Sequence, residues 1–483
     1  MFNPKTKNTV RSKVGNIAYS QKAKDDLTDY IMTEMFRPKY YGNDALQDIP
    51  KLFTQINDKD FLYKALVFGR NVGGLREVSA LLAALLAIDK RFKSDPIKKE
   101  VFLKAIKRPD DMLKTWGAIK HLTGTHYIPK AYSKACAKAL ERMDYYQLKK
   151  YASNSKEFKL KDLVKMVHPD PRKSKTGDLD VFKKVIEDRL PKIQTAQTIN
   201  ASGKENRIEK YKEVIKQGKL GTLALLRNLA KLYKKDRELS ILIQEQLKDI
   251  DRANKAMVMP IDMFKAYLAC KQEGVLTKKL RGILLDLFVK RSKEVNIVEP
   301  TDRPVVLIDG SGSMYGYPME NAVVTAMQLV SAIPQTRVVI FADTWAEITP
   351  YTYEDVFEWF ERNFKNGGWG LQPKVDVGYA TYIEEALNVI YDKETTHIFI
   401  LSDMQLYGRN SIDKPLQKYT NMKDFKKVVL WDMNPYTRGK PFNPNSDKVI
   451  SLAGYSDKLV EFLPILMKTG KNLSSIIENY EIF

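Results

Sequence analysis

Five oxygen-bearing side chains in this sequence stand at positions that suit a metal ion. Asp309, Ser311 and Ser313 alternate with two glycines, Thr381 precedes a helical pattern, and Asp403 comes later in a Ser-Asp pair. Hard divalent cations bind oxygen ligands, and Mg²⁺ usually keeps waters beside only one or two carboxylates. We therefore expect these five residues to bind a divalent ion, with Mg²⁺ first and Mn²⁺ or Ca²⁺ as alternatives. For the first three residues taken alone, a Gly/Ser turn after a core strand is an equal alternative.

The two carboxylates follow strand-like runs. Residues 305–308 (VVLI) and 396–401 (THIFIL) are typical of buried parallel strands. Further strands are expected at 338–341 and 427–431, and helices at 320–333, 353–364, 381–392 and 456–469. This alternation predicts a doubly wound α/β domain over residues 299–483, and ligand sites in such sheets lie at the carboxyl ends of strands. Trp369, in a glycine-rich loop, is expected in the core rather than at the rim of the site.

Basic residues are concentrated in one part of the chain. The 483 residues have a formal net charge of +21, yet residues 301–483 hold 18 Lys and Arg against 23 Asp and Glu. Residues 1–300 therefore carry an excess of 26 positive charges. An excess confined to one region favours a polyanionic partner for that region over a general surplus of lysine for solubility.

The location of the protein is indicated by its cysteines and its apolar runs. The two cysteines, Cys136 and Cys270, lie far apart and form no CxxC pattern, which suits a reducing compartment. The chain has no apolar run of about 18 residues, so no membrane span is expected. The basic N-terminus lacks the apolar core of a secretory signal. We expect a cytoplasmic protein.

Residues 21–298 have a helical pattern almost throughout. Helices are expected near 96–107, 109–122 and 130–151, among others. Paired helices at intervals of roughly 35–45 residues predict a HEAT- or armadillo-like stack. Residues 1–20 are polar and basic without a period, and we expect them to form an arm.

Three motifs in the helical region resemble those of a known family. They are residues 161–169 (KDLVKMVHP), 224–229 (ALLRNL) and 260–267 (PIDMFKAY). They precede a DxSxS, Thr, Asp order that resembles the metal-ion-dependent adhesion site of von Willebrand factor A domains. In this order, the motifs resemble the TROVE module of the Ro autoantigen family. The resemblance covers nearly the whole chain, roughly residues 15–483.

The resemblance to Ro implies both a fold and a function. The fold would be an all-α ring of HEAT-like helix pairs with a positively charged hole, followed by a von Willebrand factor A domain. Ro proteins bind single-stranded 3′ ends of structured or misfolded RNAs in the hole and Y-class RNAs on the outer surface. Bacterial relatives are associated with exoribonucleases. Where the family has an RNA-contacting histidine, this chain has Leu160, so one outer contact is expected to be missing.

Cationic residues with interleaved tyrosines are candidates for RNA binding, since phosphates need cations and unstacked bases need aromatic partners. Lys134, Lys138 and Arg142 are four apart and form a stripe along a helix. Arg227 interrupts an apolar helix, so it either pairs with an acid inside the protein or faces RNA. The full candidate set is Lys134, Lys138, Arg142, Lys149, Lys150, Lys161, Lys165, His168, Arg172, Lys173, Lys175, Arg227, Asn228 and Lys231.

The leading hypothesis is a non-enzymatic scaffold that binds RNA ends in RNA quality control or decay. Its metal site would recruit a protein partner such as an exoribonuclease. A metal-dependent nuclease is a second hypothesis, but two carboxylates with three hydroxyls differ from the clustered acids of a two-metal site. An adhesion or structural protein that acts through the A domain is a third, and it would not need the basic region.

Overall fold

The computed structural model of the chain describes residues 9–11, 17–20, 22–33, 45–152, 157–201, 206–255, 258–294, 297–404, 413–434, 439–440, 448–455, 457–469 and 473–483. The chain divides into two compact units. Residues 22–193 with 473–483 form the helical unit, and residues 1–21 with 194–472 form the sheet unit. These packing units differ from the domain limits expected at residues 20/21 and 298/299, which stay a prediction. No helix in the described ranges is long and apolar enough to cross a bilayer.

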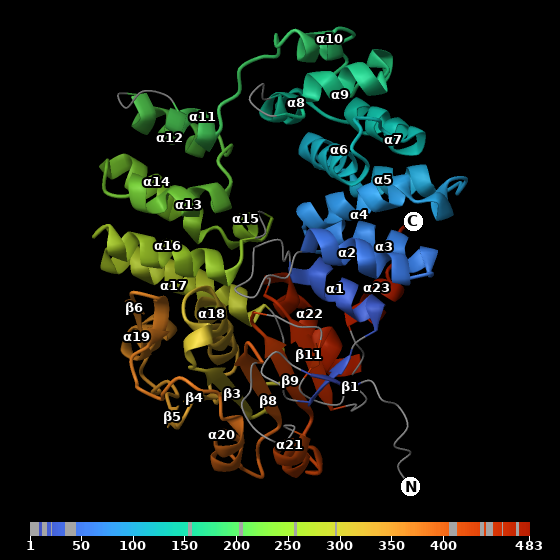
Figure 1. The fold of residues 1–483 in the computed structure, drawn as a ribbon. Coiled ribbons are helices and arrows are strands. Elements are labelled where there is room, and N and C mark those ends of the chain that lie inside the picture. The colour runs from blue at the N-terminus through green and yellow to red at the C-terminus, as the bar shows by residue number, and fades with distance from the viewer. Residues whose placement is uncertain are drawn as a thin grey trace. The chain divides into compact units, whose positions relative to one another are not determined.

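The helical unit is built from short helices in two layers (Figure 1). They are α1 (Ala23–Thr33), α2 (Ala45–Gln55), α3 (Lys59–Asn71), α4 (Glu77–Ile88), α5 (Lys98–Ala105), α6 (Pro109–Thr123), α7 (Lys130–Glu141), α8 (Tyr145–Tyr151), α9 (Leu160–Val167), α10 (Val181–Ile186) and α23 (Leu473–Glu478). Alternate helices pack on one another: α3 packs on α5, α5 on α7 and α7 on α9. In the same way α2 packs on α4, α4 on α6 and α6 on α8. Helix-pair repeats stack in this way.

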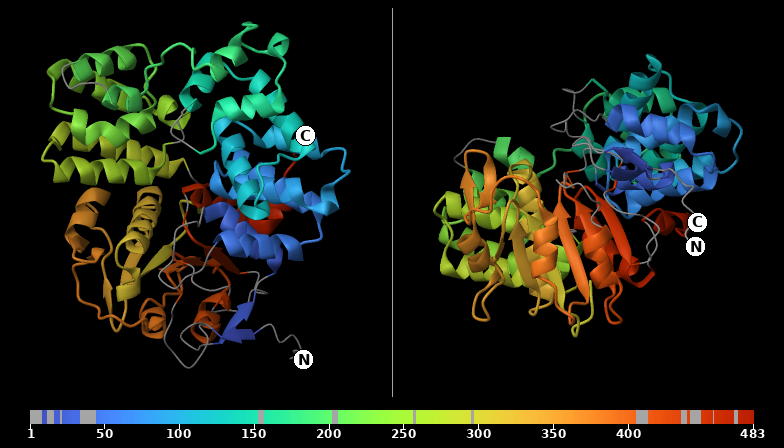
Figure 2. Two further views of the ribbon diagram at one scale, coloured as in Figure 1. Left: turned by 45° about the horizontal axis from the view of Figure 1, so that its top comes forward. Right: turned by 60° about the horizontal axis from the view of Figure 1, so that its bottom comes forward.

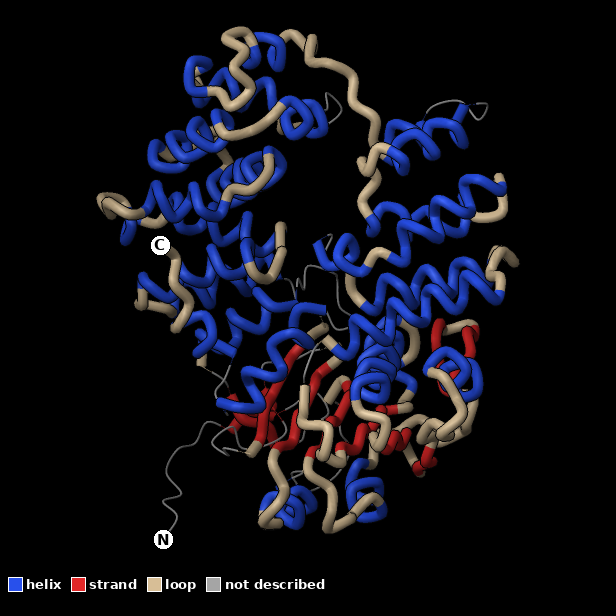
Figure 3. Tube along the Cα trace, turned by 180° about the vertical axis from the view of Figure 1, so that it is seen from behind, coloured by secondary structure: helices blue, strands red, loops and turns tan. Residues whose placement is uncertain are grey.

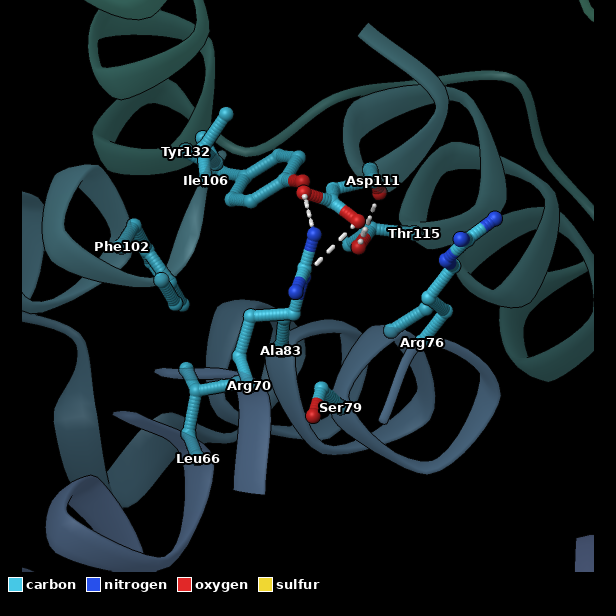
Figure 4. A pocket seen from close by; sticks show the side chains of 12 residues that line it. Leu66, Arg70, Arg76, Ser79, Ala83, Phe102, Ile106, Asp111, Thr115 and Tyr132 are labelled. Atoms are coloured by element: carbon cyan, nitrogen blue, oxygen red, sulfur yellow. Dashed lines mark hydrogen bonds and ion pairs between the residues drawn. The ribbon is translucent and has the colours of Figure 1, made fainter. Parts of the chain in front are cut away.

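A buried ion pair joins α3 to α6 (Figure 4). Arg70 donates from Nε and Nη2 to both carboxylate oxygens of Asp111, at 3.0 and 2.9 Å. Asp111 also accepts the backbone N–H groups of Lys107 and Arg108, which closes the first turn of α6. The cavity beside the pair measures only about 20 Å³, little more than one water molecule needs. The pair therefore connects two helices and leaves no room for a ligand.

The helix expected over residues 130–151 is two helices, α7 and α8. Asp144 separates them: its carboxylate accepts the N–H of Gln147 at 2.7 Å, and the Gln147 side chain accepts the N–H of Asp144 at 3.1 Å. This reciprocal pair is a capping box, which starts a new helix. The periodicity continues across the break because Met143 and Leu148 are both buried.

In the described ranges, seven helices of the sheet unit precede its main sheet. They are α11 (Ala196–Ala201), α12 (Arg207–Lys216), α13 (Thr222–Leu232), α14 (Arg237–Lys248), α15 (Ile250–Lys255), α16 (Pro260–Gln272) and α17 (Lys278–Lys293). α16 meets α19 (Val356–Asn363) through aromatic rings: Tyr267 stacks on Phe357 with centroids 4.3 Å apart. Arg281 of α17 forms two hydrogen bonds with Asp355, at 2.8 and 2.9 Å. These helices and the α/β part therefore share one core.

The main sheet has six strands in the order β11-β9-β8-β3-β4-β5. The strands are β3 (Pro304–Asp309), β4 (Arg337–Phe341), β5 (Trp345–Glu347), β8 (His397–Ser402), β9 (Lys427–Asp432) and β11 (Val449–Ala453). They run parallel except β5, which is antiparallel to β4. The chain passes from β3 outward to β4 and later returns to β8 on the other side, so the topological switch point lies between β3 and β8 (Figure 2).

Helices α18 (Tyr317–Ala332), α20 (Ile383–Val389), α21 (Asp413–Thr420) and α22 (Asp457–Thr469) complete the α/β part. α20 and α21 pack on buried residues of β3, β4, β8 and β9 to form one apolar core. The fold class expected from the sequence, a helical region followed by a doubly wound α/β domain, is confirmed. In the described part of the chain, the strands all belong to the sheet unit (Figure 3).

Two small antiparallel sheets complete the described part of the sheet unit. β1 (Thr9–Arg11) pairs with β2 (Ile17–Ser20), and β2 pairs with β10 (Gly439–Lys440). Part of the basic N-terminal segment expected as an arm therefore belongs to a sheet. β6 (Phe364–Gly367) and β7 (Gly370–Pro373) form a separate hairpin.

Candidate metal centre and nucleic-acid surface

The two carboxylates of the candidate metal centre lie at the switch point of the main sheet. Asp309 ends β3 and Asp403 directly follows β8, its parallel neighbour. Both side chains are buried, each with 0% exposure. Asp309 accepts the N–H of Ser311 at 2.9 Å through Oδ1 and the hydroxyl of Ser402 through Oδ2. The parallel pairing of β3 with β8 explains why the two carboxylates meet, because it places the carboxyl ends of both strands at one edge of the sheet.

The electrostatics of this pair favour a bound cation. Burial, and next the negative charge of Asp403, raise the pKa of Asp309 to about 7, against the opposing hydrogen bonds from Ser402 and Ser311. Two buried carboxylates destabilise each other unless a positive charge lies between them. Within the described ranges, Asp309 forms no ion pair with Lys or Arg. A divalent ion would neutralise both groups, so the donor set fits the expected metal.

The three hydroxyls lie on loops at the same edge. Ser311 is buried and its Oγ is 3.2 Å from that of exposed Ser313. Thr381 is buried and lies two residues before α20. Its loop packs on the DxSxS loop, because a Cβ at Gly310 would lie only 2.8 Å from the Val377 side chain. Among the residues that the structure describes, no three His, Cys, Asp or Glu side chains form a metal cluster, so a centre here would combine two carboxylates with hydroxyls.

Asp343 is a residue of this edge that the sequence analysis missed. It lies in the turn between β4 and β5 and accepts the N–H groups of Tyr379 at 2.8 Å and Ala380 at 3.2 Å. Gly378 has a φ of +86°, and a Cβ there would overlap the Asp343 carboxylate. Asp343 therefore fixes the loop that carries Thr381. The signal that identified Asp309 and Asp403, an acid just after a buried strand, was present here too.

Trp369 is not a core residue, and that prediction was wrong. Its side chain is 83% exposed. It stands in the two-residue connection between β6 and β7, at the tip of the hairpin, where Asn366, Gly367 and Gly368 are exposed as well. A glycine-rich turn permits this position, and the tryptophan lines a pocket that also includes Gly312 of the DxSxS loop. The alternative position, at the rim of the candidate site, is the observed one.

The candidate RNA-binding residues of the basic cluster lie on neighbouring helices of the helical unit. α7 carries Lys134 and Lys138 and ends at Arg142, and α9, which packs on α7, carries Lys161 and Lys165. The remaining members follow on α8 (Lys149, Lys150), at the end of α9 (His168) and in the next loop (Arg172, Lys173, Lys175). All are exposed except Lys149 and Lys161, which are half-buried.

Several of these cations have acidic neighbours. Lys149 lies 3.0 Å from Asp188, and Arg172 and Lys173 lie 3.1 and 3.6 Å from Asp170. Pairs this exposed contribute little to stability, so the cations can exchange their partners for phosphates. Leu160, at the position of the family's histidine, is fully buried, and its side chain offers no outer contact.

The second group of candidates lies in the sheet unit, on α13. Arg227 and Lys231 are exposed, which decides against a buried ion pair for Arg227. Asn228 is half-buried: its amide donates to the carbonyl of Ala224 at 2.8 Å, and its carbonyl oxygen accepts from Asn200 at 3.0 Å. Arg227 thus faces outward from α13, whose Leu225, Leu226 and Leu229 are buried.

Together the fold, the candidate metal residues and the candidate RNA-binding residues define a class of protein. It has stacked helix pairs followed by a von Willebrand factor A-like domain with a DxSxS loop at the sheet's switch point. The crystal structure of the Deinococcus radiodurans RO (RSR) protein has this fold: it matches with a TM-score of 0.60 and 15% identity, over 92% of this chain and 99% of that one. No family model and no curated protein matches the sequence. The resemblance to Ro proteins is confirmed as a shared fold.

Proposed function

We propose that this protein is a Ro-like RNA-binding protein of the cytoplasm. It binds the single-stranded 3′ ends of structured or misfolded non-coding RNAs and acts as a scaffold in RNA quality control or decay. The observation that carries this proposal is the exposed cationic face of α7 and α9. Residues 130–193 hold 17 Lys and Arg against 9 Asp and Glu, and phosphate contacts dominate the affinity of proteins for nucleic acids.

The charges along α7 are available to a ligand. Lys134 and Arg142 are exposed and form no ion pair with any residue in the described ranges. Lys138 lies 3.7 Å from Glu100, with about half of each side chain exposed at 48% and 43%. Such a pair is worth at most about 1 kcal/mol, and a phosphate can replace the glutamate.

An exposed aromatic side chain on α8 favours single strands over duplexes. Tyr146 is 44% exposed, and Lys150 lies over its ring at 5.4 Å. Unstacked bases stack on exposed aromatic rings, while the bases of a duplex are not accessible to them. When a base stacks on Tyr146, Lys150 is then placed to contact the phosphate of the adjoining RNA backbone.

The metal site serves the same scaffold. We assign Asp309, Ser311, Ser313, Thr381 and Asp403 as the residues that hold a divalent ion, with Mg²⁺ preferred for an all-oxygen set. When bound, such an ion offers a position for an acidic oxygen from a partner protein such as an exoribonuclease. The chain's own contribution is to orient the donors: Asp343 fixes the Thr381 loop, and the N–H of Ser311 orients Asp309.

A charge-reversal experiment tests the RNA surface. The triple variant Lys134→Glu, Lys138→Glu and Arg142→Glu should bind a duplex with a single-stranded 3′ tail at least about tenfold more weakly than wild type, because three phosphate contacts become repulsive. Fluorescence anisotropy measures this, with a blunt duplex as the reference ligand, which wild type should bind less tightly.

The matched control reverses three exposed lysines of the sheet unit, Lys393→Glu, Lys418→Glu and Lys423→Glu, with the same change of net charge. It should retain nearly the full affinity. Equal losses in both triple variants would show that only the net charge matters, and equal binding of tailed and blunt RNA would remove the single-strand preference.

A further inference from the structure

A pocket of about 560 Å³ opens beside the DxSxS loop. This size lies within the range of specific binding sites. Its lining comes from the DxSxS region, the β6–β7 hairpin and the segment that leads to the Thr381 loop: Gly312, Tyr315, Lys365, Trp369, Gln372, Pro373, Lys374, Val375, Asp376, Val377, Gly378 and Tyr379. Because Gly312 belongs to the DxSxS loop, an occupant of this Trp369 pocket would lie beside the loop that carries Asp309, Ser311 and Ser313.

The position of the hairpin is fixed by a close backbone contact. The N–H of Gly316 donates to the carbonyl of Leu371 at 2.9 Å. Gly370 has a φ of +93°, and a Cβ there would lie 2.7 Å from the Cα of Gly316. Only glycine allows this approach. Trp369 is therefore held by its backbone next to the DxSxS region although its side chain is exposed.

Exposed aromatic side chains form the walls of the pocket. Trp369 is 83% and Tyr379 73% exposed, and the rings of Tyr315 and Tyr379 are 6.5 Å apart. Large aromatic side chains lose apolar hydration when a partner covers them, and Trp and Tyr dominate the binding energy of protein interfaces. Exposed rings around a hollow are thus suited to an apolar or aromatic side chain of a partner.

The charge and shape of the pocket favour a peptide over a nucleic acid. Lys365 and Lys374 outnumber Asp376, so the lining itself is cationic. Residues 301–483 nevertheless carry 23 acids against 18 bases, which opposes a long polyanion. One side of the lining is a continuous stretch of chain, residues 372–379. An extended peptide can lie along such a stretch through contacts with its side chains.

We propose that the Trp369 pocket binds an extended acidic segment of a partner protein. A carboxylate of the segment reaches the ion at the DxSxS loop, an adjacent apolar or aromatic side chain packs against Trp369 and Tyr379, and a further acid pairs with Lys365 or Lys374. This inference rests on the proposed metal site and adds to it the class of partner and the residues that select it.

The test uses the full-length protein, immobilised, and synthetic peptides with a central Asp between randomised positions. A second pool has Asn at the centre. In Mg²⁺ the protein should retain Asp peptides enriched in aromatic or large apolar residues next to the Asp, and it should retain neither the Asn pool nor any peptide in EDTA. The best peptide should bind Trp369→Ala and Tyr379→Ala at least about tenfold more weakly, as expected for aromatic hot spots.

The matched control is Tyr353→Ala, which removes another ring that is 83% exposed but does not line the pocket. This variant should bind the best peptide with the affinity of wild type. Mg²⁺ binding by calorimetry, measured separately, distinguishes the failures. An absence of Mg²⁺ binding refutes the metal site and this inference with it. Mg²⁺ binding without Trp369-dependent peptide retention refutes this inference alone. If oligouridylate binding, rather than peptide binding, depends on Trp369, the pocket is an RNA site and the proposal is wrong.

Discussion

Replacing Asp309 with asparagine should abolish the stabilisation that Mg²⁺ gives to the wild-type protein. Asparagine keeps the shape of the side chain and can still accept the N–H of Ser311, so the loop should keep its conformation. The substitution removes one of two buried negative charges, and hard cations bind neutral amides much less strongly than paired carboxylates. A ligand at about a hundredfold excess over its Kd stabilises a protein by about 2.7 kcal/mol.

We therefore expect wild type to gain about 2.7 kcal/mol under that excess of Mg²⁺, and Asp309→Asn to gain almost nothing. Thermal unfolding with and without Mg²⁺ measures the difference. Asp376→Asn is the control, because Asp376 is an exposed acid close to the site but outside the proposed donor set; it should respond as wild type does. A full Mg²⁺ response in Asp309→Asn, or its loss in Asp376→Asn, would show that the ion binds elsewhere.

The second large effect concerns the helical unit. Arg70→Met should destabilise the packing of α3 on α6 by about 3 kcal/mol, because it leaves Asp111 buried without its cation. The Arg70 and Asp111 side chains are each only 8% exposed. Asp111 keeps its hydrogen bonds from two backbone N–H groups. We therefore expect a loss of folding free energy at the lower end of the range for a broken buried ion pair.

Hydrogen exchange in the full-length protein measures this loss of stability helix by helix. The backbone amides of α3 and α6 should exchange roughly a hundredfold faster in Arg70→Met than in wild type. The control is Lys114→Met, which breaks an ion pair between α6 and α4 in which both side chains are more exposed, Lys114 at 32% and Glu77 at 50%. It should cost about 1 kcal/mol or less. Equal exchange rates in the two variants would mean that the buried pair contributes no more than the exposed one.

Local pattern was sufficient to predict most of the sheet and the meeting of two carboxylates at its edge. Asp309 and Asp403 each follow an apolar run, and parallel strands place such residues at one edge whatever lies between them in the sequence. Lys134 and Lys138 were correctly placed on one exposed face because helical spacing alone decides that. These features depend only on nearby residues.

Other features depend on contacts between distant segments, which a single sequence does not contain. Trp369 was expected in the core because tryptophan is usually buried, yet it lies at the exposed tip of a hairpin that the contact of Gly370 with Gly316 holds beside the DxSxS region. Asp343 binds backbone groups 36 and 37 residues further along the chain. Arg70 and Asp111 are 41 residues apart, and neither has a local pattern that marks its partner.

The salt dependence of RNA binding tests the central claim, that the cations of α7 hold the phosphates of an RNA strand. For single strands, log K plotted against the logarithm of the salt concentration has a negative slope, which becomes steeper by about 0.7 for each phosphate contact. The triple variant at Lys134, Lys138 and Arg142 should therefore have a slope about 2 units shallower than wild type, while the control triple at Lys393, Lys418 and Lys423 keeps the wild-type slope. Equal slopes for wild type and the α7 variant would contradict the account.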